Sequence, residues 1–524
     1  MAARWRSTSQ MWWALALLAG ALQAASLAWP FSAQSLTDSL GLVRGQPIWW
    51  LQTLAMATLV TVLMRSGTAR QAAWRGWLFT LAWLSVTFAW LFISMHTYGG
   101  LSAVLAVLAV LALAGALAIY YAAACWIFWM LAQKNRVSSA IVFASLWLLA
   151  ELARGQWLTG FGWGAVGYSQ VDGPLQPLVG WIGMYGVSGL AAAIAALLAV
   201  VWSAPAVKVK MLAGVLMLGW LMLPLTLPAA KGADWGELSV TLLQGNIAQE
   251  EKFEPATGVL KALRWYGEQL QANRSALIIT PETALAVLPE QLPDGYWQAL
   301  QTRFGQGNQA ALVGLPLGSY EQGYTNSVVG FKPGQASPWR YDKHHLVPFG
   351  EFIPPMFRWF TDLMHIPLGD FSRGALPQPT FDWQGQRIAA TVCYENLYSN
   401  ELATQFSDAA KSPTILVNVS NLGWFGEHLA MDQHLQIARM RALEFDRPFL
   451  LATNTGQTAI VNHLGQVTHT ALAHTAVALQ GVVQGRTGLT PYARWIGQFG
   501  LLPLWGVALA VVLVSVLTRR RHLP

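Results

Sequence analysis

Long apolar runs constrain this chain more than any other feature of its sequence. Crossing the hydrocarbon core of a bilayer takes about 20 helical residues. Runs of this kind occur at 11–29, 47–64, 77–95, 101–132, 138–152, 178–202, 209–228 and 498–517. The fifth is short unless it continues through Glu151, and the fourth is long enough to be broken near Gly115. The pattern predicts a polytopic α-helical membrane domain with eight spans and excludes a purely soluble protein.

Charged residues make up only 11% of the 524 residues, and they are unevenly distributed. Residues 1–230 contain three acids and eleven Lys and Arg, whereas residues 231–485 contain 22 acids and 16 bases. The net charge of +7 therefore comes from the apolar parts, and the polar part is acidic. Because a nucleic-acid binder concentrates basic residues on a soluble surface, we expect no nucleic-acid partner.

The basic residues of the short loops predict the topology, because Lys and Arg accumulate on the cytoplasmic side. They fall on alternate loops, as Arg4 and Arg6, then Arg65, Arg70 and Arg75, then Lys134 and Arg136, then Lys208 and Lys210, and finally Arg519 to Arg521. Both termini are then cytoplasmic, and residues 229–497 lie on the opposite side. The first run also has features of a signal peptide, with small residues at Ala24 and Ala25, but its cleavage would disturb this alternation.

Between the seventh and eighth runs the hydrophobic period changes. Short β-rich runs at 238–246, 275–282, 311–318, 387–395 and 413–421 alternate with helical stretches such as 255–273 and 428–446. This predicts an α/β or α+β domain with buried central strands. We expect a membrane domain at 1–228 with seven helices, a catalytic domain at 229–485, and a linker, eighth helix and basic tail at 486–524.

The two cysteines lie far apart in the sequence, so neither a disulfide framework nor a zinc-type spacing is available. Cys125 sits among apolar residues of a span, where we expect it to pack. Cys393, in "TVCYENLY", ends an apolar strand ahead of a helical stretch. A strand-to-helix elbow exposes a nucleophile, and the helix N-terminus favours its thiolate. The alternative is a buried structural thiol.

Two further polar positions have both a structural and a catalytic interpretation. Glu282, in "IITPETAL", follows a strand and could begin a helix or face a site at the strand's carboxyl end. Lys343, in "RYDKHHLVPFGEFIP", lies in a charge cluster that a solvated loop would also explain. Together with Cys393, they supply the base, the cation and the nucleophile that thiol acyl transfer requires.

The motifs "TPET", "YDKHHLVPFGEF" and "VCYEN" resemble the Glu, Lys and Cys motifs of the nitrilase superfamily, in the usual order. This resemblance implies a four-layer αββα sandwich. With eight spans around that domain and "LARGQWLTGFGWGAVGYSQ" at 152–170, the whole chain resembles the apolipoprotein N-acyltransferases. That family moves an acyl chain from a membrane phospholipid, typically phosphatidylethanolamine, to the α-amino group of a lipoprotein's diacylglyceryl-cysteine. The resemblance implies an inner-membrane enzyme with a periplasmic catalytic domain, and we expect a monomer.

Carried over by motif, the resemblance makes Cys393 the nucleophile that becomes an acyl thioester, Glu282 the general base and Lys343 the charge stabiliser. It places three supporting residues near the active site, namely Glu351, Tyr394 and Glu395. An aromatic pair of the family matches Trp424 and Phe425. The chain departs from the family pattern at Leu422, Gly162 and Phe253, where the family usually has Asp, often Pro and often Trp.

Several aromatic and basic residues are candidates for lipid contact. Segment 352–371 is apolar for a surface loop and could lie at the lipid interface or pack on the domain core. The candidates are Phe357, Trp359, Phe253, Trp163, Tyr168 and Arg154, beside Trp424 and Phe425.

We expect no metal and no organic cofactor, because no complete set of metal ligands occurs at a suitable spacing. Two other functions compete with acyl transfer. A membrane-anchored carbon–nitrogen hydrolase would use the same three residues on a soluble amide or nitrile. A transporter or lipid-binding scaffold would not need them, but membrane-embedded acids are nearly absent here, and ion-coupled transport usually requires such groups.

Overall fold

The computed structural model describes residues 2–32, 41–132, 137–228, 232–335, 337–354 and 371–520. The chain folds into two compact units. The helical unit contains Met1–Phe92, Ser102–Ala230 and Phe499–Pro524, and the β-rich unit contains Ile93–Leu101 and Lys231–Gln498. The short segment Ile93–Leu101, which overlaps the third apolar run, therefore belongs to the β-rich unit.

Each of the eight apolar runs overlaps a helix. These helices are α1 (Ala2–Ala25), α3 (Trp49–Met64), α4 (Ala69–Thr87), α6 (Ala103–Leu131), α7 (Ser138–Gln156), α8 (Val179–Ser203), α9 (Val207–Thr226) and α16 (Leu502–Arg520). Helix α6 runs unbroken through Gly115, and α7 continues past Glu151. After α4, a second segment, α5 (Leu91–Ile93) with the π-helical turn η1 (Ser94–Tyr98), is bent from it by 64°.

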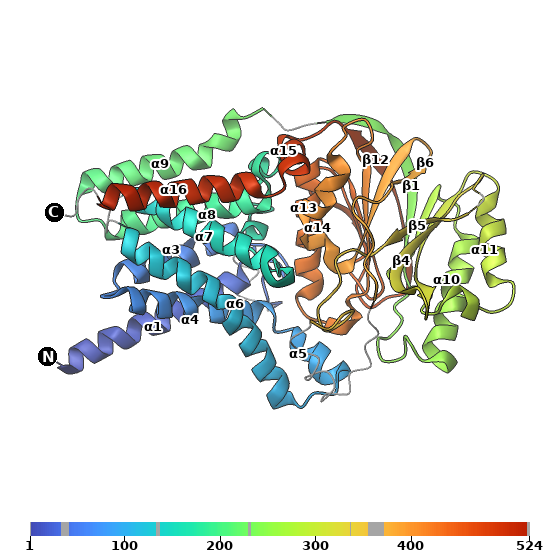
Figure 1. Ribbon diagram of the computed structural model, residues 1–524, viewed down its shortest axis with the longest axis horizontal. Coiled ribbons are helices and arrows are strands. Elements are labelled where there is room, and N and C mark those ends of the chain that lie inside the picture. The colour runs from blue at the N-terminus through green and yellow to red at the C-terminus, as the bar shows by residue number, and fades with distance from the viewer. Residues whose placement is uncertain are drawn as a thin grey trace. The chain divides into compact units, whose positions relative to one another are not determined.

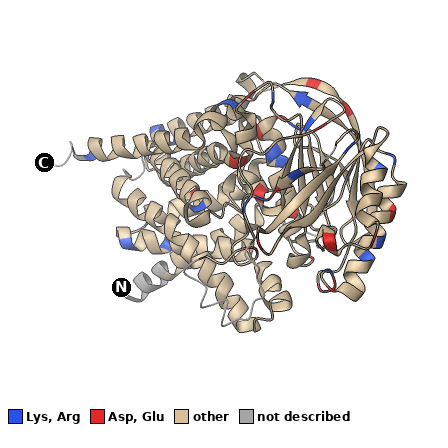
Figure 2. Ribbon diagram, turned by 45° about the vertical axis from the view of Figure 1, so that its right-hand side comes forward, with Lys and Arg blue, Asp and Glu red and all other residues tan. Residues whose placement is uncertain are grey.

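Among the described residues, four helices are long and apolar enough to cross a membrane, or five if the bent pair is one span. The four are Ala103–Leu131, Ser138–Thr159, Gln176–Ser203 and Leu502–Arg519. Helices of the helical unit carry mostly tan positions with some blue ones, whereas both blue and red positions are spread through the β-rich unit (Figure 2). The chain therefore combines an apolar helical part with a polar β-rich part.

Two buried charged residues, Glu151 and Arg154, organise the connection between α7 and α8. This connection contains the short turns η2 (Trp157–Thr159), η3 (Val166–Gln170) and η4 (Gln176–Leu178). Arg154 Nη1 donates to the carbonyl oxygens of Phe161 at 2.6 Å and Trp163 at 2.8 Å. Glu151 Oε1 accepts the amide of Val166 at 2.9 Å. Two charges of one helix thus satisfy backbone groups that the interior of the helical unit would otherwise leave without partners.

The β-rich unit consists of two six-stranded sheets, with orders β12-β1-β2-β3-β4-β5 and β11-β10-β9-β8-β7-β6. The first contains β1 (Ala233–Gln244), β2 (Leu277–Ile279), β3 (Ala310–Ser319), β4 (Gly323–Phe331), β5 (Trp339–Asp342) and β12 (Val477–Thr487). The second contains β6 (Phe381–Trp383), β7 (Gln386–Val392), β8 (Ile415–Ser420), β9 (Phe449–Thr453), β10 (Ala459–Val461) and β11 (Val467–Thr470). In each sheet the three central strands, β1-β2-β3 and β7-β8-β9, are parallel, and the flanking strands are antiparallel.

Side chains from both sheets form the main core, in which Leu242, Leu312, Val392 and Val417 are fully buried. A second core lies between the first sheet and two helices, α10 (Leu260–Ala272) and α11 (Tyr296–Gly305). Helix α14 (Ala430–Phe445) packs on β9 and β10 of the second sheet. Figure 1 shows α10 and α11 on one side of the sheets and α14 on the other. This is the four-layer αββα sandwich that the nitrilase resemblance implies.

The five predicted β-rich runs overlap β1, β2, β3, β7 and β8, and the two predicted helical stretches contain α10 and α14. Because β2, β3, β7 and β8 belong to the parallel cores, their carboxyl ends present the following loops at one edge of each sheet. The residues named as catalytic candidates lie at or near such strand ends, which is how this fold positions them.

Candidate active site

Cys393 lies where β7 passes into the short helical turn η8 (Cys393–Leu397). Its backbone is left-handed, with φ of 52°, a conformation that costs a non-glycine residue free energy and persists where surrounding contacts impose it. Those contacts converge on its carbonyl oxygen, which accepts Asn418 Nδ2 at 3.1 Å and lies 3.4 Å from His434 Nε2. The side chain remains partly exposed, so the elbow presents the sulfur rather than burying it completely.

Glu282 follows β2 and points its carboxylate at donors from three different segments. Its Oε1 accepts Asn326 Nδ2 at 2.7 Å and lies 3.3 Å from Lys343 Nζ. Its Oε2 accepts the backbone amide of Asn421 at 2.9 Å. Only 7% of this residue is exposed, and these contacts fix the orientation of its carboxylate.

Lys343 directly follows β5 and is 1% exposed. Its ammonium lies 2.9 Å from each oxygen of Glu351 as well as 3.3 Å from Glu282 Oε1. Asn326 Nδ2 donates to Oε1 of both acids, at 2.7 Å to Glu282 and at 2.8 Å to Glu351. The two carboxylates are therefore joined by one ammonium and one amide group, which keeps both acids close without direct repulsion.

The electrostatics of this cluster assign proton positions. Burial and the charge of Glu282 raise the pKa of Cys393, while Lys343 and the Asn421 amide act in the opposite direction. Burial acts to raise the pKa of Glu282, but the nearby ammonium groups of Lys343 and Lys252 lower it below its usual value. The resting site therefore contains a thiol next to a carboxylate, which is the arrangement that a general base requires before it activates a nucleophile.

Lys343 remains an ammonium in this setting. Burial opposes its charge, but Glu351 and Glu282 outweigh that effect and raise its pKa. A permanently charged donor beside the sulfur can stabilise the oxyanion that forms when a thiolate adds to a carbonyl group. The cluster therefore brings together a thiol, a carboxylate and a fixed positive charge, which is the set of groups that thiol acyl transfer requires.

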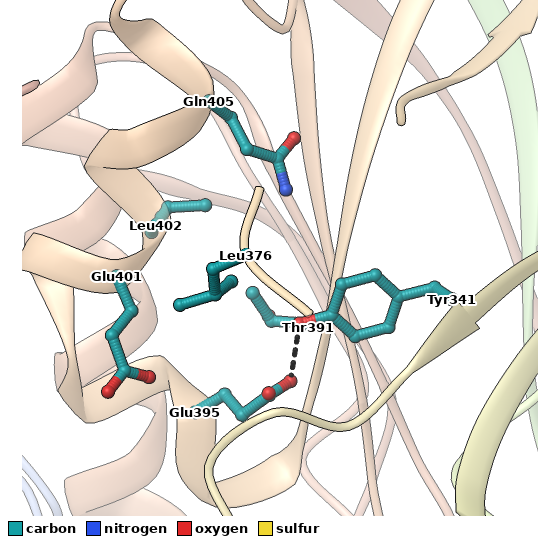
Figure 3. Close-up of a pocket in the computed structure, with 7 residues that line it drawn as sticks. All are labelled: Tyr341, Leu376, Thr391, Glu395, Glu401, Leu402 and Gln405. Carbon is teal, nitrogen blue, oxygen red and sulfur yellow. Dashed lines mark hydrogen bonds between the residues drawn. The ribbon is translucent and has the colours of Figure 1, made fainter. Parts of the chain in front are cut away.

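Glu395 does not face this cluster. Its Oε1 accepts the amides of His344 at 2.6 Å and His345 at 3.1 Å, and its Oε2 accepts the amide of Val392 at 2.6 Å. Its Oε2 also accepts the hydroxyl of Tyr341 at 2.9 Å, next to a small pocket between the sheet and the following helical turns (Figure 3). Burial raises the pKa of Glu395 to about 7, although the three backbone amides and the charge of Lys343 act to lower it. Glu395 thus ties the Cys393 elbow to the loop that carries Lys343.

The other supporting candidate, Tyr394, is also turned away from the carboxylates. Its ring packs edge-on against Tyr398, with 5.3 Å between the ring centroids, and lies 5.5 Å from the ring of His345. His345 in turn hydrogen-bonds Glu401 at 2.8 Å. The residue after Cys393 therefore packs among aromatic rings.

Two of the predicted lipid-contact residues form an exposed aromatic cluster. Trp424, in the turn η10 (Leu422–Phe425), is 37% exposed and Phe253 is 52% exposed, with 6.5 Å between their ring centroids. The ring of Tyr98 from η1 packs edge-on against Trp424 at 5.7 Å. Phe425 closes the same turn and is half-buried. Leu422, at the position where the family usually has Asp, is fully buried.

Three other candidates lie inside the helical unit. Arg154 is 1% exposed, and Trp163 and Tyr168 are each 3% exposed. Their burial favours packing over direct lipid contact for these side chains. Phe357 and Trp359 lie outside the described residues. In the described part of the chain, no three His, Cys, Asp or Glu side chains gather in a way that could hold a metal ion.

Comparison with known proteins accounts for both halves of the chain. The family model "Apolipoprotein N-acyltransferase N-terminal domain" matches residues 43–197, and the model "Carbon-nitrogen hydrolase" matches residues 239–491. The apolipoprotein N-acyltransferase of Verminephrobacter eiseniae is 49% identical over 95% of this chain and 95% of its own. The chain belongs to the apolipoprotein N-acyltransferase family. The Ralstonia nicotianae member is 41% identical, with 90% of each chain covered.

Among solved structures, that of Saccharomyces cerevisiae Nit3, a member of branch 10 of the nitrilase superfamily, covers 47% of this chain and 90% of its own. It is 15% identical, with a TM-score of 0.34. For this member of the apolipoprotein N-acyltransferase family, the carbon–nitrogen hydrolase match contains all of Glu282, Lys343 and Cys393.

The sequence reasoning overlooked three polar residues of the site in this family member. Asn326 bridges the two carboxylates from the middle of β4. Asn421 donates its backbone amide to Glu282 directly after β8. Lys252 is 2% exposed and donates from Nζ to the carbonyl oxygen of Glu282 at 3.0 Å. Only Asn421 had a sequence signal, since it ends the predicted strand at 413–421.

Proposed function

We propose that this chain transfers a fatty acyl group from a membrane phospholipid to the α-amino group of an apolipoprotein's diacylglyceryl-cysteine. The transfer passes through a thioester on Cys393. The observation that supports this most directly is the cluster of Glu282, Lys343 and Glu351 around a partly exposed cysteine, in a chain that also has helices long and apolar enough to cross a membrane. Family membership supports it independently.

In the first half-reaction, Glu282 takes the proton of the Cys393 thiol, and the thiolate adds to the ester carbonyl carbon. The oxyanion lies near Lys343, and collapse of the tetrahedral intermediate breaks the bond to the glycerol oxygen. That oxygen leaves as the alcohol of the lysophospholipid with the proton from Glu282. The acyl thioester remains on the enzyme, which is the covalent intermediate of ping-pong catalysis.

In the second half-reaction, the neutral α-amino group of the apolipoprotein adds to the thioester carbonyl. Glu282 takes a proton from the attacking nitrogen, the C–S bond breaks, and the sulfur regains the proton as the amide forms. Water must be kept from the thioester between the two steps, because hydrolysis would make the enzyme a lipase. We propose that Trp424, Phe425 and Phe253, with Phe357 and Trp359, contact the acyl chains.

We further propose eight spans with both termini cytoplasmic and the β-rich unit in the periplasm, in a monomeric inner-membrane enzyme that uses phosphatidylethanolamine. The alternating basic loops support this topology. Labelling with a membrane-impermeant maleimide tests it. In a variant lacking Cys125 and Cys393, Y320C adds a cysteine at a position of the β-rich unit that is 92% exposed. Intact spheroplasts label this variant if the unit is periplasmic and remain unlabelled if it is cytoplasmic.

The acyl transfer is tested by mass spectrometry of the intact protein after incubation with phosphatidylethanolamine alone. We expect a hydroxylamine-labile acyl adduct on the wild type and on C125A, but not on C393A. The adduct should disappear on adding a diacylglyceryl-cysteine peptide with a free α-amino group, and persist with the N-acetylated peptide. Absence of any adduct, with turnover of small amides instead, would identify a membrane-anchored carbon–nitrogen hydrolase.

A further inference from the structure

A second buried lysine lies in this site, and the steps above do not use it. Lys252 comes from the turn after β1 and is 2% exposed. Its ammonium donates to the main-chain carbonyl of Glu282 at 3.0 Å. Among the described residues, this is the one hydrogen-bond acceptor that its Nζ reaches, and the centroid of the Phe253 ring lies 6.0 Å away, so two of its three N–H groups make no hydrogen bond there. An ammonium buried with spare donors is a costly arrangement unless negative charge arises nearby.

The charges of the cluster show where such negative charge arises. Glu282 and Glu351 contribute two carboxylates, and Lys343 contributes one ammonium to both. Without Lys252 the site would carry one net negative charge before Cys393 ionised. Each step that forms a thiolate or an oxyanion would then add a second negative charge. With Lys252 charged, the resting site is neutral.

The ionisable groups that act on Cys393 come from several segments. They are Glu282, Lys343, Glu351, Lys252 and, through the Cys393 carbonyl, His434. Burial lowers the pKa of His434 to about 4, so this ring is neutral at physiological pH and adds no positive charge. Burial likewise lowers the pKa of Lys252 to about 8, and the charges of Glu282 and Cys393 oppose that effect. Lys252 therefore still carries its proton in most molecules near neutral pH.

We propose that Lys252 is a second charge-stabilising residue of the active site, which offsets the second carboxylate and favours negative charge on Cys393 and on the adjoining oxyanion. It also holds the Glu282 main chain through its carbonyl group. The catalytic part of this role rests on the proposed acyl transfer. The effect on the Cys393 thiol does not, so it can be measured without any lipid.

The decisive measurement is the rate of Cys393 alkylation by iodoacetamide as a function of pH, followed at the Cys393 peptide by mass spectrometry. K252M retains the length and bulk of the side chain and removes the charge. We expect its alkylation midpoint to lie at higher pH than the wild type's by about one unit or more, which is about a tenfold loss of thiolate at a given pH. K252R should restore much of the wild-type midpoint. K261M, at an exposed position of α10, is the matched control.

Acyl-enzyme formation is measured on the same variants. We expect K252M to be about ten- to a hundredfold slower than the wild type, with a melting temperature close to that of K261M. A K252M protein that is folded and has the wild-type alkylation midpoint would overturn the proposal, even if its acylation were lost, because Lys252 would then be only a structural support. A different outcome separates the two proposals. If K252M shifts the alkylation midpoint but neither the wild type nor any variant forms an acyl adduct, then Lys252 lowers the pKa of the Cys393 thiol and the proposed acyl transfer is wrong.

Discussion

Asn326 provides the sharpest test of the electrostatic reasoning, because its amide group is the uncharged donor that two carboxylates share. Its Nδ2 donates to Glu282 at 2.7 Å and to Glu351 at 2.8 Å, and its Oδ1 finds no donor among the described residues. N326D replaces this shared donor with a third carboxyl group of nearly the same shape. The new group faces two carboxylates and the ammonium of Lys343, whereas the ammonium of Lys252 contacts the main chain of Glu282.

The magnitude follows from these contacts. Two unit charges about 4 Å apart interact by about 4 kcal/mol at an effective dielectric constant of about 20. Repulsion from two carboxylates less attraction to one ammonium leaves about 4 kcal/mol against the ionised form. At about 1.4 kcal/mol for each pKa unit, the pKa of the introduced carboxyl should rise by about 3 units, from about 3.9 to about 7.

The raised pKa of the introduced carboxyl determines the direction in which acyl-enzyme formation by N326D changes with pH. Below about pH 7 the introduced carboxyl is protonated and can still donate to one of its two neighbours. As pH rises through its pKa, the proton is lost and Glu282 is pushed from its position beside Lys343. We expect acyl-enzyme formation by N326D, relative to the wild type, to fall by up to about tenfold for each pH unit above about 7.

The assay is the initial rate of thioester formation from phosphatidylethanolamine between about pH 6 and about pH 9, a range that covers the expected pKa. N326L is the matched control, because it removes the donor without adding a charge and should lower the rate by a factor that does not change with pH. If the N326D profile runs parallel to that of the wild type over this range, the carboxylates are not coupled through Asn326, and the charge assignment of the site is wrong.

Three further variants test the supporting contacts. E395Q leaves one of the amides that its carboxylate accepts without an acceptor, at a cost of about 1–3 kcal/mol, so its melting temperature in detergent and its acylation rate should both fall. N418L removes a donor from the Cys393 carbonyl and should slow iodoacetamide alkylation about tenfold, whereas an unchanged rate would show that the elbow holds without it. E444A removes the buried carboxylate that lies 2.9 Å from Arg441 Nε and should destabilise the protein by about 3–5 kcal/mol, seen as faster thermal inactivation than in a variant at the exposed Glu427.

The sequence predicts those strands of the fold that are long, apolar and central in their sheet. Strands β3, β7 and β8 are buried over most of their length, and β1 is buried from Leu238 onward apart from Ser239, so each appears in the sequence as an apolar run. The edge strand β11 is exposed at all four positions, and no such run marks it. The edge strands of this domain are therefore determined by their pairing with a neighbouring strand and not by an apolar pattern in their own sequence.

The site could be predicted only where chemistry coincides with a strand end. Cys393, Glu282 and Lys343 all follow strands directly or closely, and polar residues there stand out against the apolar runs before them. Asn326 lies inside β4, and the sequence alone does not distinguish a buried asparagine in a strand from an exposed one. Lys252 lies in a polar turn, and only the folded chain shows that this turn is covered.

Neighbouring positions in the sequence can mislead for the same reason. Glu395 is two residues from the nucleophile, yet the turn that follows Cys393 carries its carboxylate back to the amide of Val392 and to the loop after Lys343. Glu351 is far from Cys393 in the sequence, yet its charge acts on the sulfur. Neutralising Glu351 and neutralising Glu395 should therefore have different effects on the reaction. A change at Glu351 should alter the pH dependence of the thiol, whereas a change at Glu395 should loosen the connection between the two loops and lower the rate at every pH.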